Sequence, residues 1–177
     1  MIALDFDFQV EAGWLRFNKE VNKIVELSKI SALNKTSSQF RNVLSRDVAK
    51  LSRVKVGIIK GKTKLYRASR RQKEAHVFVN LTGVKAAKLN PKQNKRGVRA
   101  GRHSFKGSFI AKVTSGYVGV FKRKSGSAYP IKAITIEVGD ELMKSGDRLM
   151  STFVIRKYQD TFRNEMSFRL RRSGLGG

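Results

Sequence analysis

The sequence predicts an α+β fold in a single domain, with helices at both ends of the chain and a β-rich middle. Apolar residues recur at helical spacing over 13–53 and over 139–172, and at strand spacing between them. Clusters of Ser, Gly, Asn and Lys separate the strand-like runs of the middle, 54–138. Hydrophobic residues make up 40% of the 177, with 11 Phe among them, which is enough for a core.

The positive charge of the chain is confined to its middle. Residues 48–136 hold 23 Lys and Arg against one acidic residue, Glu74. Residues 1–47 hold 7 basic and 6 acidic residues, and residues 137–177 hold 8 and 6. A field of one sign repels itself unless it faces anions. The charge therefore predicts a polyanionic partner, with nucleic acid as the first candidate.

Residues 1–12 are expected to form a strand or arm. The apolar residues over 2–10 fall at every second position, which is typical of a strand with one apolar face. Acidic Asp5 and Asp7 lie on the other face. A lone strand of this kind can pair with a neighbouring subunit. The expected subunit interface is Leu4, Phe6, Phe8 and Val10.

Residues 13–53 are expected to form two antiparallel helices joined by a short turn. One apolar stripe runs from Trp14 to Ser28 and a second from Phe40 to Leu51. Asn34-Lys35-Thr36 interrupts the pattern, and Thr36 or Ser37 can cap the second helix.

Residues 54–138 are expected to form a central antiparallel β-sheet or a partly open barrel. The candidate strands are 64–68, 76–80, 97–100, 110–113, 117–122 and 132–138. Ser115-Gly116 suits a hairpin turn between the fourth and fifth strands. Residues 88–107 look like a long, mobile, basic loop.

Residues 139–172 return to a helical period and are expected to form a C-terminal helix. A loose apolar stripe extends from Leu142 to Leu170. The last residues, 173–177, read Ser-Gly-Leu-Gly-Gly and are expected to be a flexible tail.

The basic loop supplies the candidate contacts with nucleic acid or with an acidic partner. Point charges on a flexible loop suit phosphate contact without base reading. A solvated loop in a basic protein is the alternative interpretation. The candidate residues, including three cations at the end of a later strand, are Lys92, Lys95, Arg96, Arg99, Arg102, Lys106, Lys122, Arg123 and Lys124.

The sequence offers no credible catalytic, cofactor or metal site, and we expect the protein not to be an enzyme. There is no Cys, and neither His76 nor His103 has a carboxylate at metal-ligand spacing. Paired carboxylates are absent from the β region. The stretch 57–63 resembles a phosphate-binding loop but is one residue short, which favours a basic turn leading into a strand.

The chain is not expected to enter a membrane. No apolar run reaches the roughly 18 residues that a membrane span needs. The first residues carry acids where a signal peptide has a basic leader, so we expect a mature protein that is not secreted. The lack of Cys fits a reducing cytoplasm.

The order of segments resembles the minor tail protein Z family of tailed bacteriophages, also called tail completion proteins. The resemblance covers about residues 15–165. It rests on six segments in this order: Ala32-Leu-Asn-Lys-Thr36, Lys64-Leu-Tyr-Arg-Ala-Ser69, Asn90-Pro-Lys-Gln-Asn-Lys-Arg-Gly-Val98, Phe109-Ile-Ala111, Gly119-Val-Phe-Lys-Arg123 and Tyr129-Pro-Ile-Lys132.

The resemblance implies a structural protein of the virion, assembled in the host cytoplasm. It further implies a homo-oligomeric ring, six-fold to match a tail tube, at the head-proximal end of the tail. The expected partners are other tail and neck proteins and genomic DNA passing through the lumen; the basic residues would face that DNA or acidic neighbouring proteins. The alternative is a free, sequence-nonspecific nucleic-acid-binding protein of ribosomal or nucleoid type.

Overall fold

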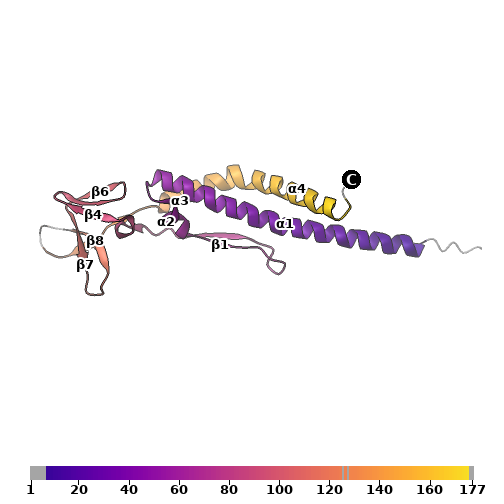
Figure 1. The fold of residues 1–177 in the computed structure, drawn as a ribbon, viewed down its shortest axis with the longest axis horizontal. Coiled ribbons are helices and arrows are strands. Elements are labelled where there is room, and N and C mark those ends of the chain that lie inside the picture. Colours follow the sequence, from indigo (N-terminus) through magenta and orange to yellow (C-terminus); the bar gives the residue numbers. More distant parts are fainter. Residues whose placement is uncertain (1–6, 125, 127, 176–177) are drawn as a thin grey trace, which may run out of the picture.

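One long helix forms the axis of the molecule. The computed structural model describes residues 7–124, 126 and 128–175, and of residues 7–16 it describes the backbone alone. Helix α1 (Asp7–Leu51) is a continuous 45-residue helix. Figure 1 shows α4 along one side of α1, the strand β1 along the other, and strands β4 to β8 gathered at the far end.

The expected helical hairpin over 13–53 is wrong, because α1 does not break. No Gly or Pro occurs between Trp14 and Lys55, so no helix-breaking residue interrupts α1 near Asn34. The Asn34 side chain binds the backbone of Ala68, donating to its carbonyl at 3.0 Å and accepting from its N–H at 2.8 Å. The interruption in the apolar pattern is therefore a docking contact rather than a turn.

The expected strand over 2–10 is wrong for residues 7–10, which lie in α1. Phe8 and Val10 are therefore helical, whereas Leu4 and Phe6 lie outside the described residues.

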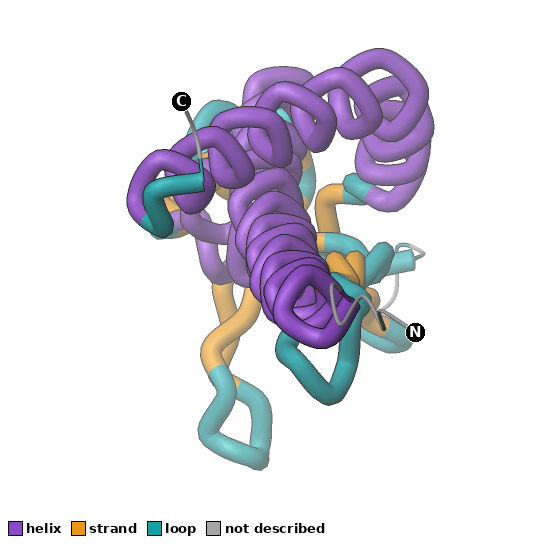
Figure 2. The backbone as a smooth tube through the Cα atoms, turned by 90° about the vertical axis from the view of Figure 1, so that its right-hand side faces the viewer, coloured by secondary structure: helices purple, strands orange, loops and turns teal. Residues whose placement is uncertain are grey.

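The C-terminal helix is confirmed, with a π-helical segment inside it. Helix α3 (Gly139–Leu149) continues through the π-helical η2 (Met150–Val154) into α4 (Ile155–Arg172). The helical segment from α3 to α4 packs antiparallel on α1: Arg148 of α3 pairs with Asp47 near one end, and Arg169 of α4 donates to Ser31 Oγ at 2.7 Å near the other. Figure 2, looking along α1, shows the two helices side by side.

The strands form four small antiparallel sheets, and within the described residues none closes into a barrel. The α+β prediction is therefore confirmed, with the single central sheet divided into smaller ones. The sheets are β1 (Thr63–Tyr66) with β2 (His76–Val79); β3 (Val84–Lys85) with β10 (Thr135–Ile136); β4 (Pro91–Asn94), β5 (Gly97–Ala100) and β6 (His103–Lys106); and β7 (Ser108–Lys112), β8 (Val118–Arg123) and β9 (Ile131–Ala133).

The basic segment 88–107 is not the long loop that the sequence suggested. It ends the 3-10 helix η1 (Ala86–Leu89) and then supplies the whole β4–β5–β6 sheet. Asn94 Oδ1 accepts the Arg96 N–H at 3.0 Å and so tightens the turn between β4 and β5. Gly97 follows with φ +143, a conformation that side chains rarely adopt.

One core joins the helices to the strands. It contains buried residues of α1, of the short helix α2 (Val56–Gly61), of the strands and of α3. Its largest fully buried members include Leu44, Ile59, Val84, Val98, Val120 and Leu142. The core lies near the C-terminal end of α1, where the strands β4 to β8 gather, and the N-terminal end of α1 extends away from it (Figure 1).

Candidate functional site

The β4–β5–β6 sheet presents one cationic face to solvent. Lys92 lies opposite Arg99 across the β4–β5 pair, and Lys106 lies opposite Gly97 across β5–β6. Because alternate residues of a strand share a face, Lys92, Arg99 and Lys106 lie on the same side of this sheet. All three are exposed, as are Lys95, Arg96 and Arg102 in the two turns.

The opposite face of this sheet is buried and fixes the sheet in place. Val98 and Ala100 are in the core. The Ser108 hydroxyl accepts the Val98 N–H at 3.2 Å and donates to the Phe105 carbonyl at 2.6 Å. Gln93 Oε1 accepts the Ile110 N–H at 2.8 Å. These bonds tie the sheet to β7, so the cations stand on a rigid platform rather than on a mobile loop.

The β7–β8–β9 sheet adds a second group of cations. Lys122 on β8 lies directly opposite Lys132 on β9, and both are exposed. The Arg123 guanidinium lies 5.5 Å from the centre of the Phe109 ring. Lys124 follows at the end of β8 and is also exposed. Like charges directly opposite each other destabilise a sheet unless an anion lies between them.

None of the nine predicted contact residues forms an ion pair with another described residue. The five ion pairs of the described part of the chain lie in the helices and the β1–β2 hairpin: Lys35–Glu165, Lys73–Glu26, His76–Glu74, Arg148–Asp47 and Arg169–Glu165. The cations of β4 to β9 are therefore open to an external anion.

A group of three lysines that the sequence did not single out lines a cavity beside these sheets. Lys62, Lys85 and Lys88 line a hollow of about 730 Å³ together with Gly57, Gly61 and Gly83. Lys62 Nζ donates to the Thr82 carbonyl and, at 3.0 Å, to its hydroxyl. Burial lowers the pKa of Lys62, Lys88 lowers it further, and Glu137 opposes both. The hollow is thus a second place where an anion would relieve crowded positive charge.

Only the fold brings the three lysines of this hollow together. They lie after α2, in β3 and in η1, and the spacing along the sequence gives no motif. The stretch 57–63 that resembled a phosphate-binding loop forms most of α2 and the start of β1, rather than the expected basic turn. Lys85 also lies over the Tyr117 ring, with Nζ 4.9 Å from its centre.

The two histidines have structural partners. His103 Nε2 lies 3.0 Å from the Ser52 carbonyl oxygen, and its ring stacks on Phe105. His76 lies 3.3 Å from a Glu74 carboxylate oxygen on an exposed strand. In the described part of the chain, no three His, Asp or Glu side chains are grouped so that they could hold a metal ion.

No described helix combines the length and the apolar character that a membrane crossing requires.

The exposed cations of the β4–β5–β6 sheet suit the phosphate backbone of a nucleic acid better than its bases. The aromatic rings of the cationic sheet, His103 and Phe105, lie on its inner face and are only partly exposed. Stacking on single strands needs exposed rings beside the charges, whereas backbone contact needs only Lys and Arg. The surface can therefore attract a polyanion without reading its sequence.

Comparison with known proteins gives a family. The model of the family described as prophage minor tail protein Z matches residues 16–173, which takes in every strand and all of α2, α3 and α4. No curated protein and no solved structure matches the chain.

Proposed function

Because the chain belongs to the prophage minor tail protein Z family, it is a structural component of a phage tail and of the virion, and we propose that it completes the head-proximal end of the tail as a non-enzymatic ring. The cationic sheets β4 to β9 would face the DNA that passes through the tail. Other tail and neck proteins would be its neighbours.

The cations of β4 to β9, which are exposed and have no ion pair among the described residues, carry this proposal. A ring brings the same charges of several subunits around one axis, where they repel one another unless an anion lies between them. DNA in a tail lumen is such an anion, and it must be held without regard to sequence. The rigid cationic face, with its rings turned inward, has the chemistry for that contact.

The ring also needs a contact between subunits. The N-terminal apolar residues Leu4, Phe6, Phe8 and Val10 remain the proposed source of that contact. The six-fold order is proposed to match the symmetry of a tail tube.

DNA binding by a charge-reduced variant tests the proposal. We expect the triple variant Lys92→Ala/Arg99→Ala/Lys106→Ala to bind duplex DNA more weakly than the wild type. The slope of log affinity against log salt should become less steep by about 0.9 for each phosphate that the variant no longer neutralises. Fluorescence anisotropy with two duplexes of unrelated sequence, over a salt series, measures both quantities.

A triple variant of the helices serves as the matched control. Lys50, Lys144 and Arg156 are exposed and outside the ion pairs of the described residues, and changing them to Ala removes the same charge. Equal losses of affinity in the two triple variants would show that net charge alone binds DNA and would reject the cationic face. Tails purified from phage carrying the first variant should keep their length but deliver DNA poorly. Full DNA binding without any location in tails would favour the free nucleic-acid-binding protein.

A further inference from the structure

The N-terminal part of α1 extends beyond the rest of the described protein. Two contacts mark where the rest of the described protein stops along α1. The β1–β2 hairpin reaches Glu26 through the Lys73–Glu26 ion pair. Helix α4 reaches Ser31 through the Arg169 hydrogen bond. Residues 7–21 project past both (Figure 1), over about 22 Å. This part of the chain is therefore in a position to reach another subunit.

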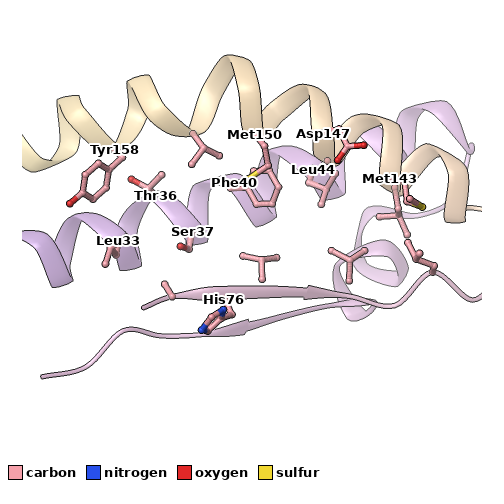
Figure 3. A pocket seen from close by; sticks show the side chains of 17 residues that line it. Leu33, Thr36, Ser37, Phe40, Leu44, His76, Met143, Asp147, Met150 and Tyr158 are labelled. Carbon is pink, nitrogen blue, oxygen red and sulfur yellow. The ribbon is translucent and has the colours of Figure 1, made fainter. Parts of the chain in front are cut away.

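An apolar groove lies further along α1, on the C-terminal side of the Lys73–Glu26 ion pair. It has a volume of about 610 Å³ and lies between α1, the strand β2 and the helical segment from α3 to α4 (Figure 3). Met143 and Met150 on its wall are each 54% exposed, so the groove is open to solvent. Its other apolar lining residues include Leu33, Phe40, Leu44, Val77 and Val79.

Two features of the groove favour an extended segment with free backbone groups. The Thr36 side chain lines it and is 3% exposed, yet its hydroxyl has no hydrogen-bond partner among the described residues. Strand β2 belongs to a two-stranded sheet in the described part of the chain, so one of its edges has no ladder partner. An added strand would supply N–H and C=O groups to such an edge and apolar side chains to the groove.

The segment 1–6 has that chemistry, and geometry assigns it to a second copy. Ile2, Leu4 and Phe6 alternate with other residues, as in a strand with one apolar face. Six residues span at most about 21 Å. The α1 helix places Asp7 about 39 Å from Leu33, the first residue of α1 in the groove. The segment therefore falls short of the groove of its own chain.

Charge complementarity supports the same occupant. Residues 1–11 carry Asp5, Asp7 and Glu11 and no Lys or Arg. The hairpin that forms one wall of the groove carries Lys64, Arg67, Arg70, Arg71 and Lys73 against Glu74 alone. An acidic segment entering beside this hairpin meets opposite charge. Asp147 lines the opposite side of the groove. Because its charge repels acidic residues, the apolar end of segment 1–6 is expected on that side.

We propose that Ile2, Leu4 and Phe6 of one copy insert into the groove between β2, α1 and α3–α4 of the next copy. This contact is head-to-tail, and such contacts close into rings when the rotation between subunits allows. The inference rests on the proposed ring, because it names the two surfaces through which the ring forms.

Complementation between two full-length variants tests the contact. The arm variant Leu4→Asp/Phe6→Asp keeps an intact groove, and the groove variant Ser37→Phe keeps an intact arm. We expect the wild type to associate and each variant alone to remain monomeric. An equimolar mixture should form dimers and nothing larger, because only one productive contact is possible. Light scattering coupled to gel filtration measures the masses, and Ser173→Phe, an exposed site at the end of α4, is the matched control.

A fluorescent peptide of residues 1–8 separates this inference from the ring. The peptide should bind the arm variant, and its affinity for the groove variant should be lower by about tenfold or more. If the arm variant assembles like the wild type, the ring stands and the arm contact is rejected. If the wild type stays monomeric but the peptide binds the arm variant and not the groove variant, the ring is rejected. The assignment of segment 1–6 to the groove then still holds. If the peptide binds both variants equally, the contact is rejected.

Discussion

The helices and the cationic sheets of this protein differ in whether their charged side chains form ion pairs. The helices and the β1–β2 hairpin hold all five ion pairs of the described residues. The sheets β4 to β9 expose nine predicted contact cations with no ion pair among those residues. Charge stabilises the fold in the first region, whereas in the second it opposes the fold and is available for binding. This difference is what the proposed function expects, with the helices holding the structure and the sheets available to a polyanionic partner.

The carboxylates of the helical region show how its charges are used. A hydrogen bond from Ser145, followed by Arg148, lowers the pKa of Asp47. A hydrogen bond from Lys35, followed by Arg169, lowers the pKa of Glu165. Both acids lie between α1 and the C-terminal helices, so their ionised forms help to hold these helices together.

The largest expected effect comes from breaking the cationic sheet while leaving the helices intact. A Cβ at Gly97 would lie 2.1 Å from the Phe105 carbonyl oxygen, and Gly97 has φ +143. Gly97→Ala should therefore separate β5 from β6, at a cost of about 3 kcal/mol or more. Hydrogen exchange should show reduced protection in 91–106 with α1 and α4 unchanged, and duplex DNA affinity should fall.

Gly107→Ala controls for backbone strain alone. Gly107 also has a positive φ, +67, but nothing lies within 4 Å of its added Cβ. We expect it to cost about 1 kcal/mol and to keep the sheet. If Gly97→Ala melts the helices together with the sheet, the two regions are one cooperative unit and the comparison between them fails for stability.

The second effect tests the ion pairs of the helices through pH. Glu165→Gln should lower the free energy of unfolding by about 1–2 kcal/mol near neutral pH, because Lys35 and Arg169 lose their shared carboxylate. The lowered pKa means that the stabilisation is present above the unfolded pKa of about 4.3 and is lost as pH falls through the folded value. Urea unfolding at pH 7 and at pH 3 measures the difference between wild type and variant.

That difference should shrink at the lower pH. Glu20→Gln, on an exposed position of α1, should change little at either pH. A constant difference between wild type and Glu165→Gln from pH 7 to pH 3 would show that the carboxylate charge does not stabilise the helices.

The sequence predicted helices at both ends of the chain and several strands of its middle, but not the contacts between distant segments. The hairpin at Ser115-Gly116 is confirmed: the Val113 N–H donates to the Tyr117 carbonyl at 2.9 Å, between β7 and β8. Strand β4 was missed because Pro-Lys-Gln-Asn has no β-branched or aromatic residue, and only its pairing with β5 makes it a strand. The break predicted at Asn34 failed because the partner of that side chain, Ala68, lies 34 residues away.

The predicted contact cations lie in a different setting from the one expected. The six residues from Lys92 to Lys106 lie together as expected, on a sheet instead of a loop. Lys62, Lys85 and Lys88 meet only through the packing of α2, β3 and η1, which no local pattern encodes. Their role as binding residues, like that of the nine, stays a prediction.

The smallest expected change in stability comes from one substitution that should raise stability while lowering DNA affinity. Lys132 lies opposite Lys122, so Lys132→Glu replaces a like-charge pair by an opposite one and should stabilise the fold by about 0.2–1 kcal/mol. The same change puts a negative charge on the proposed DNA surface, so duplex affinity and its salt dependence should both fall. Lys144→Glu, at an exposed position of helix α3, makes the same change of charge and should leave affinity nearly unaltered. A gain in stability together with a loss of DNA affinity is expected only where repulsion between the two lysines is retained in order to bind a ligand. The cations of β8 and β9 would instead be merely solvated if Lys132→Glu lost stability. The same conclusion would follow if Lys132→Glu bound DNA as well as Lys144→Glu does.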